Sequence, residues 1–518
     1  MKIKNTIYKH FFIGAIACGC LLTACDFEEI NEPKYQITAD DMKGDNFNLG
    51  AFFPQLQDIA YPAQENNYQM NENLIGDVYG RYMMTAGKWS TKNFAVYNAP
   101  EGWVKFPFNN VMGNVYTAWN EIRKMTGGEG VNFAWAQILR VTAMQRLTDM
   151  YGPIPYSKVA SGELKVSYDS QEEAYKAMFI DLTDAIDVLT TFVVSNPGSV
   201  PMAQYDGVYG GDFSKWVKYA NSLKLRMAMR IRFADADLAK QMAEEAINHT
   251  LGVITANSDN AKYNYAKGNP LHIMWDSYSD CRLCADITSY MIGYKDPRMS
   301  KYFQEATIGE KKGYFGIRSG LNSPGTQYST QYSSPNVVKE DPLYWMYASE
   351  ISFLRAEGAA IGWNMNGTAE QFYNDGIRLS FEQVGASGAD TYLANSDLKQ
   401  ADYEDPNNSA SINAVSTITI KWDDAASAEQ KLERIITQKW IALWPMGQEA
   451  WSEYRRTGFP KMFPLAQNTA YGNLLIANRI PFSADEYLNN KENMPAAKIA
   501  LGGEDNYATN LWWDKYRK

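Results

Sequence analysis

The chain has 518 residues, of which 45% are hydrophobic, and it carries 49 basic and 59 acidic side chains. The net charge of -10 repels phosphate backbones, and no dense run of lysine and arginine offsets it, so a nucleic-acid partner is not expected. Three histidines, none of them in an HExxH or GxSxG frame, leave little material for a Ser-His-Asp triad or a histidine-rich metal site.

The first 24 residues have the pattern of a secretory signal. Lys2, Lys4 and Lys9 precede an almost unbroken apolar run from Phe11 to Ala24, and acidic residues follow soon after it. This run of about 14 residues is too short for a comfortable bilayer span, which needs roughly 20. We therefore expect residues 1–24 to be removed rather than kept as a membrane helix.

Residues 22–25 read Leu-Thr-Ala-Cys and resemble the bacterial lipobox, in which the cysteine becomes an acylated N-terminus. An ordinary signal peptide with a cysteine near its cleavage site is the alternative. We expect the mature chain to begin at Cys25 and to be tethered to a membrane by its acyl chains. Without residues 1–24 the chain keeps 46 basic and 59 acidic side chains, a net charge of -13, and only His249 and His272.

Most of the remaining chain has helical periodicity. In residues 212–231, apolar side chains such as Trp216, Ala220 and Leu223 recur at intervals of three and four, and Asp212 is placed to cap the start. Strand-like alternation is short, as at residues 417–422. No Gly/Ser-rich or Pro-rich hinge divides the chain, so we expect one all-α domain over residues 25–518. Similar helical stripes cover residues 132–150, 171–192, 343–362, 369–384 and 429–447.

Long polar segments separate these predicted helices, and they carry aromatic residues. Structureless loops longer than about 12–15 residues are uncommon and are often functional. The Asn- and Gln-rich residues 64–73 are interpreted as a solvated loop rather than a binding surface. No convincing 34-residue tetratricopeptide period is legible. The polar segments are residues 61–109, 255–280, 313–342 and 388–426.

Aromatic residues in polar loops are the candidates for a sugar site. The C–H faces of sugars stack on flat rings, and their hydroxyls need amide, carboxylate or guanidinium partners. Each candidate is also compatible with simply anchoring its loop. The ligand candidates are Trp89, Trp103, Phe106, Trp275, Asp276, Tyr278, Tyr328 and Tyr332, with Asn269, Asp280, Arg282, Asn322 and Gln331 as hydrogen-bonding neighbours.

Cys281 and Cys284 form a Cys-Arg-Leu-Cys sequence. Outside the reducing cytosol they are compatible with a local disulfide or with two free buried thiols. A zinc site would need two more ligands, and only His249 and His272 are available, at spacings typical of no zinc finger. No complete D-x-[DN]-x-[DN]-G calcium loop is present, although calcium is not excluded. No cofactor or metal is therefore predicted.

Several motifs together resemble the SusD/RagB family of surface nutrient-binding lipoproteins of Bacteroidetes. The resemblance implies a single helical domain with about four tetratricopeptide-like helix pairs and long ligand-binding loops. It also implies a place on the outer face of the outer membrane, over a SusC-like TonB-dependent transporter, as a lid and a receptor for oligosaccharides or other nutrients. The motifs are IITQKWIALWPMGQEAWSEYRRTGFP (435–460), RIPF (479–482) with Glu486, Tyr487 and Asn489, TDMYGPIPYS (148–157), WVKYANSLKLRMAMRI (216–231), KDPRM (295–299) and YASEISFLRAEGA (347–359).

The C-terminal motif is interpreted as a folding element and not as a binding site. Its aromatic side chains lie close to one helical face, although Pro445 and Gly447 interrupt a continuous helix. Arg455 and Arg456 could each pair with Glu449 or Glu453. The aromatic residues in question are Trp440, Trp444, Trp451 and Tyr454.

The leading hypothesis is a binding protein without catalytic activity that captures a glycan or peptide outside the cell and passes it to the transporter. A surface glycoside hydrolase is the alternative from another class, because its acid and base carboxylates need no histidine. A purely structural partner of the transporter, with no ligand of its own, is the third hypothesis.

Overall fold

Helices dominate the computed structural model, which describes residues 46–86, 92–161, 165–321, 326–408 and 410–516. The chain divides into two units, residues 1–51 and 52–518. The described part of the first unit contains the short helix α3 (Phe47–Gly50), and all other elements belong to the second unit. Within the described ranges no helix combines the length and the apolar character needed to cross a bilayer.

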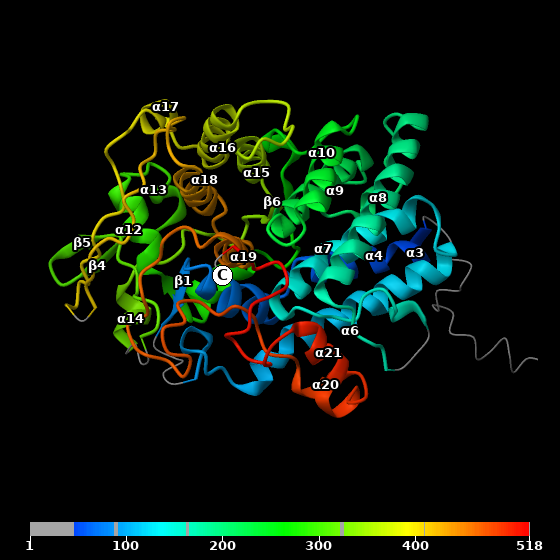
Figure 1. Ribbon diagram of the computed structural model, residues 1–518, viewed down its shortest axis with the longest axis horizontal. Helices are drawn as coiled ribbons and strands as arrows, with labels where there is room; N and C mark the ends of the chain where they lie inside the picture. Colours follow the sequence, from blue (N-terminus) through cyan, green and yellow to red (C-terminus); the bar gives the residue numbers. More distant parts are fainter. Residues whose placement is uncertain (1–45, 87–91, 162–164, 322–325, 409, 517–518) are drawn as a thin grey trace, which may run out of the picture. The chain divides into compact units, whose positions relative to one another are not determined.

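Long helices that pack in consecutive pairs form the scaffold of the second unit (Figure 1). Neighbouring helices in the chain contact each other over most of this scaffold, and α18 packs on both α15 and α16. The predicted all-α scaffold is therefore confirmed. The helices are α4 (Phe52–Ala60), α6 (Glu101–Thr126), α7 (Gly130–Tyr151), α8 (Gln171–Ser195), α9 (Phe213–Ile231), α10 (Ala236–Asn248), α15 (Ala348–Ala360), α16 (Ala369–Val384), α18 (Ala428–Ala442) and α19 (Gly447–Thr457).

Local capping explains where several of these helices begin. The side chain of Ser170 accepts from the backbone N–H of Glu173, whose carboxylate accepts from Ser170 in return, so α8 starts with a capping box. Ser427 and Gln430 make the same arrangement at the start of α18. Asp212 caps α9 as predicted, by accepting from the backbone N–H groups that follow it.

Short helices and strands lie between and around the long helices of the second unit; β4, β5 and α12–α14 lie together on one side of it, whereas α20 and α21 lie elsewhere (Figure 1). The strands pair as three two-stranded antiparallel ladders, β1 with β3, β2 with β6 and β4 with β5. These elements are α5 (Glu65–Tyr68), η2 (Gln69–Asp77), β1 (Met83–Thr85), η3 (Phe94–Val96), η4 (Val159–Ser161), η5 (Ala203–Tyr205), η6 (Asn257–Asp259), β2 (Ala261–Tyr263), α11 (Pro270–His272), η7 (Ile273–Ser277), β3 (Cys281–Leu283), α12 (Ala285–Gly293), α13 (Met299–Tyr302), β4 (Ala306–Ile308), β5 (Lys311–Gly313), α14 (Thr326–Gln331), β6 (Leu343–Met346), α17 (Ala389–Leu393), α20 (Ala484–Asn489) and α21 (Met494–Leu501).

Two predicted helices have different bounds in the structure. The helix expected at residues 343–362 starts only at Ala348, because residues 343–346 form β6 and pair with β2. The helix expected at residues 429–447 ends at Ala442, and α19 begins at Gly447 after a turn that contains Pro445. Proline lacks the N–H that a helix interior needs, which accounts for the break.

The strand-like segment at residues 417–422 forms no strand. Its side chains do alternate, with Ile418 and Ile420 buried and Thr417 and Lys421 exposed. Its carbonyl groups, however, accept hydrogen bonds from helix side chains, since the Tyr294 hydroxyl donates to Ile418 O and the Tyr373 hydroxyl to Ile420 O. The alternation of buried and exposed side chains is therefore present, as the sequence pattern indicates. The backbone carbonyls, however, bond to tyrosine side chains and not to a neighbouring strand.

The interpretation of residues 64–73 as a solvated loop is wrong. Residues 69–77 form the π-helix η2, and Asn71, Glu72 and Asn73 are buried in it. Glu72 accepts from Arg146 at 2.5 Å and from the backbone N–H of Gln448 at 3.0 Å. The polar run is buried because the interior supplies its hydrogen-bond partners.

The aromatic residues of the C-terminal motif pack in the interior, as predicted. Arg456 pairs with Glu453 at 2.7 Å, as expected, and also with Glu357 at 2.6 Å. Arg455 donates a hydrogen bond to the backbone carbonyl of Asp149. Its guanidinium also lies over the indole of Trp451, 3.6 Å from the ring centre. The buried aromatic residues are Trp440, Trp444, Trp451 and Tyr454.

Candidate ligand-binding site

The elements η7, β3 and α14 bring six of the predicted residues into one region. Trp275 and Asp276 lie on η7, and Tyr278 follows directly after it. Strand β3, which carries Arg282, contacts both η7 and α14. We name Trp275, Asp276, Tyr278, Arg282, Tyr328 and Tyr332 the loop site.

The solvent-facing part of the loop site is its η7 side. Asp276 is exposed, and Trp275 and Tyr278 are half-buried. The indole N–H of Trp275 donates to Val337 O at 3.0 Å, and the ring of His272 packs against the indole edge-on at a centroid distance of 5.5 Å. These contacts hold the indole in a fixed orientation, as a preformed stacking surface requires.

Most of the predicted hydrogen-bonding neighbours form hydrogen bonds within the protein, which hold the backbone around the loop site in place. Arg282 is buried and donates to Trp275 O at 3.0 Å and to Cys281 O at 2.7 Å, and burial lowers the pKa of its guanidinium. Asp280 accepts from Gln69 Nε2 at 2.5 Å, and Asn269 caps α11. Arg282 therefore fixes η7 to β3 and lies behind the exposed residues. Gln331, at the end of α14, is exposed.

The two tyrosines of the loop site stack on each other. Their rings lie 4.7 Å apart at an interplanar angle of 13°, and Tyr328 and Tyr332 are only 8% and 3% exposed. The Tyr332 hydroxyl donates to Asp405 Oδ1 at 2.7 Å, and burial followed by this bond raises the pKa of the phenol. Because both rings are buried, the pair stabilises the loop and presents no exposed ring face to a ligand. The i, i+4 spacing of the two tyrosines favours their contact on a helix.

Trp103 and Phe106 lie elsewhere, on the first turns of α6. Both are half-buried, and Trp103 stacks on Phe94 with ring centroids 6.3 Å apart. Figure 1 shows α6 and α14 well separated within the second unit. Trp89, Asn322 and Cys25 lie outside the described residues, so their roles stay predictions; Trp89 follows β1 in sequence and Asn322 precedes α14.

Cys281 and Cys284 are free, buried thiols in the structure, which is the second of the two alternatives left open by the sequence. Burial raises the pKa of the Cys281 thiol to about 12 and raises that of Cys284 as well. Such thiols are poor nucleophiles and poor metal ligands. In the described part of the chain no group of three or more His, Cys, Asp or Glu side chains is placed to hold a metal ion.

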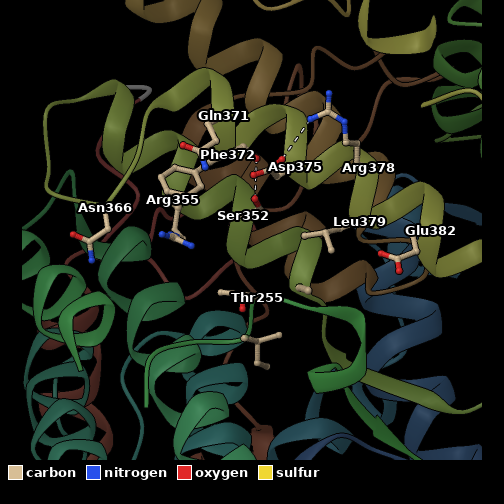
Figure 2. A pocket seen from close by; sticks show the side chains of 12 residues that line it. Thr255, Ser352, Arg355, Asn366, Gln371, Phe372, Asp375, Arg378, Leu379 and Glu382 are labelled. Atoms are coloured by element: carbon tan, nitrogen blue, oxygen red, sulfur yellow. Dashed lines mark hydrogen bonds and ion pairs between the residues drawn. The ribbon is translucent and has the colours of Figure 1, made fainter. Parts of the chain in front are cut away.

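A hollow that the sequence did not reveal lies away from the loop site, between α15, α16 and the segment that carries Ile254 and Thr255 (Figure 2). Its volume is about 330 Å³. Ser352 and Arg355 line it from α15, and a row of α16 residues lines it from the other side. The sequence does show polar side chains at helical spacing in both helices. Such a pattern usually indicates a solvent-exposed helix face, so it does not by itself predict a hollow.

Comparison with known proteins gives consistent results. The family model described as SusD-like, SusD and RagB outer membrane lipoprotein, matches residues 29–514. A SusD homologue from Bacteroides uniformis is 41% identical, with 90% of this chain and 99% of that chain covered and a TM-score of 0.85. A chitin-binding SusD homologue from Flavobacterium johnsoniae is 37% identical, with 90% and 98% covered and a TM-score of 0.86. No curated protein resembles the chain closely enough in sequence to count as a match.

The match extends over nearly the whole chain, and the solved homologues share its tetratricopeptide-like helical scaffold. It agrees with the sequence motifs, which run through the chain in the same order. The chain therefore belongs to the SusD-like family of outer membrane lipoproteins.

Proposed function

We propose that this protein is a lipid-anchored receptor on the cell surface that binds an oligosaccharide without cleaving it and delivers it to a SusC-like TonB-dependent transporter. The observation that carries the proposal is the fixed, half-exposed indole of Trp275 beside the exposed carboxylate of Asp276. A flat ring next to a hydrogen-bond acceptor suits a sugar, whose C–H face stacks while its hydroxyls donate. The chitin-binding relative supports a glycan as the ligand class.

A glycan array separates this proposal from the alternatives. The purified chain is applied to the array, with chitin oligosaccharides among the probes, and each bound glycan is then incubated with the chain and assayed for new reducing ends. We expect saturable binding of at least one oligosaccharide class and no new reducing ends. Turnover that a single Asp or Glu substitution abolishes would indicate a hydrolase, and absence of any affinity would indicate a structural partner of the transporter.

A further inference from the structure

The hollow between α15 and α16 is lined mostly by polar and charged side chains (Figure 2). Its volume of about 330 Å³ lies at the small end of the range of roughly 300–1,000 Å³ that ligand pockets occupy. The side chain of Arg355 lies below the Phe372 ring in Figure 2, whereas Arg378 lies on the other side of Asp375, with which it pairs. The two arginines of the hollow therefore differ in their partners, since Arg378 pairs with Asp375 and Asp390.

Arg355 is a half-buried cation that contacts a ring and a backbone carbonyl and forms no ion pair among the described residues. Its guanidinium lies 3.9 Å from the centre of the Phe372 ring, and its Nε and Nη2 donate to Met365 O at 3.3 and 2.9 Å. It makes no ion pair with any carboxylate among the described residues, and its Nη1 has no hydrogen-bond acceptor there. Burial lowers the pKa of this guanidinium because it removes hydration, and the carboxylate of Asp375 opposes this effect only in part. An anionic ligand would replace that hydration with a charge-assisted, planar pair.

The acidic side chains of the hollow are already engaged. Asp375 Oδ1 lies 3.4 Å from Arg378 Nη1, and Glu382 Oε2 accepts from Asn257 Nδ2 at 3.0 Å. Both carboxylates can still accept hydrogen bonds from hydroxyl groups, because Arg378 and Asn257 occupy only part of their acceptor capacity. Arg355 thus offers a cation to an anionic group, and the carboxylates and amides around it suit hydroxyl groups.

We propose that this hollow is a second ligand site, which binds a hydroxylated carboxylate of monosaccharide size, that is, a sugar acid of the uronate class. Arg355 pairs with the carboxylate, and Gln371, Asn366 and Asp375 accept from or donate to the ring hydroxyls. The site is separate from the loop site, so the sugar acid is either a ligand in its own right or an acidic end group of a longer glycan. Neither case depends on the loop site.

Titration calorimetry and ligand-observed NMR of the purified chain with galacturonate and glucuronate test the proposal. We expect saturable binding of at least one uronate by the wild-type chain and a loss of at least tenfold in affinity in Arg355→Gln. Arg378→Gln is the matched control, because it removes an exposed arginine of the same hollow that is already paired, and it should stay within about twofold. Equal uronate affinity in wild type and Arg355→Gln overturns the proposal, as does no binding by wild type.

A second set of ligands gives an outcome that does not depend on the folding of a variant. The methyl ester of galacturonate keeps the ring hydroxyls but loses the charge, and it should bind wild type at least tenfold more weakly than the free acid. N-acetylglycine keeps a carboxylate without hydroxyls and should also bind at least tenfold more weakly. Equal binding of either compound overturns the assignment. Trp275→Ala should leave uronate binding unchanged, so a failure of the loop site and a failure of this site are distinguishable.

Discussion

A network of ionised side chains is buried where α9, α15, α18 and α19 meet. Arg456 pairs with Glu357 and Glu453, and Glu453 also accepts from Arg230 at 2.5 Å and from Lys439 at 2.9 Å. These side chains are almost fully buried, so each charge depends on its partners for the solvation it has lost. The sequence motif offered Arg456 with Glu453 as one of several possible pairs, but the contribution of Glu357, about a hundred residues earlier, required the tertiary structure.

We expect Arg456→Met to lower the free energy of unfolding by about 3–5 kcal/mol, because it leaves Glu357 and Glu453 short of a buried partner. Urea denaturation followed by circular dichroism measures this change. Lys176→Met is the control, since Lys176 forms an exposed pair with Glu172, and its cost should be at most about 0.5 kcal/mol. A loss below about 1 kcal/mol for Arg456→Met would contradict the account of the network.

The same network predicts a pH dependence of stability. Burial alone would raise the pKa of Glu453, but Arg456, Lys439 and Arg230 hold it well below its ordinary value of 4.5, and the pKa of Glu357 is lowered in the same way by Arg456 and Arg232. Depressed carboxylate pKa values stabilise the fold above the unfolded value and lose this effect as the pH falls through the folded values. We expect the free energy of unfolding to decrease on acidification below about pH 4.5, and less so in Arg456→Met. An identical pH profile in the two chains would count against this.

At the scale of elements, hydrophobic periodicity located several of the long helices well, because each of these buries one continuous face. The helices α7, α8, α9 and α16 lie within a few residues of their predicted bounds. Helix α6 was not predicted at all, since residues 101–109 were assigned to a polar segment and no helical stripe covers residues 110–126. The buried η2 was also missed, because its Asn and Glu side chains are satisfied only by distant partners such as Arg146 and Gln448.

The packing of α19 on η2 depends on glycine. A Cβ at Gly447 would lie 2.4 Å from the backbone nitrogen of Asp77, which cannot move independently of η2. We expect Gly447→Ala to destabilise the fold by about 1–3 kcal/mol, as overpacking does. Gly113 on α6 has no atom within 4 Å of such a Cβ, so Gly113→Ala should be neutral or stabilising by up to about 1 kcal/mol. Equal urea midpoints for the two variants would contradict the close approach.

For the molecule as a whole, the sequence motifs were enough to recognise the family and the helical scaffold, and the sequence alone placed the loop site only in part. Trp275, Asp276 and Tyr278 are at least partly open to solvent, whereas Tyr328 and Tyr332 are buried against each other. An aromatic residue in a polar loop is buried when another side chain packs against it, as the stacked rings of Tyr328 and Tyr332 show. That information lies in the tertiary contacts, as does the hollow around Arg355.

The proposed membrane anchor is tested by Cys25→Ala. Acyl chains contribute about 0.8 kcal/mol for each buried CH2, so several chains hold a protein firmly on a membrane. We expect the variant to move from the membrane fraction to the soluble fraction or to be mislocalised, as measured by cell fractionation and immunoblotting. Unchanged membrane retention would contradict lipidation at this cysteine.

The central claim is that a fixed indole in the loop site holds a glycan, and calorimetry with Trp275→Ala tests it most directly. Trp512→Ala is the matched control, because Trp512 is also half-buried but contacts Tyr175 on α8. With the oligosaccharide that binds best to the wild-type chain, the account predicts at least a tenfold loss of affinity in Trp275→Ala and less than a twofold change in Trp512→Ala. Unchanged affinity in Trp275→Ala, with both variants folded, would contradict it.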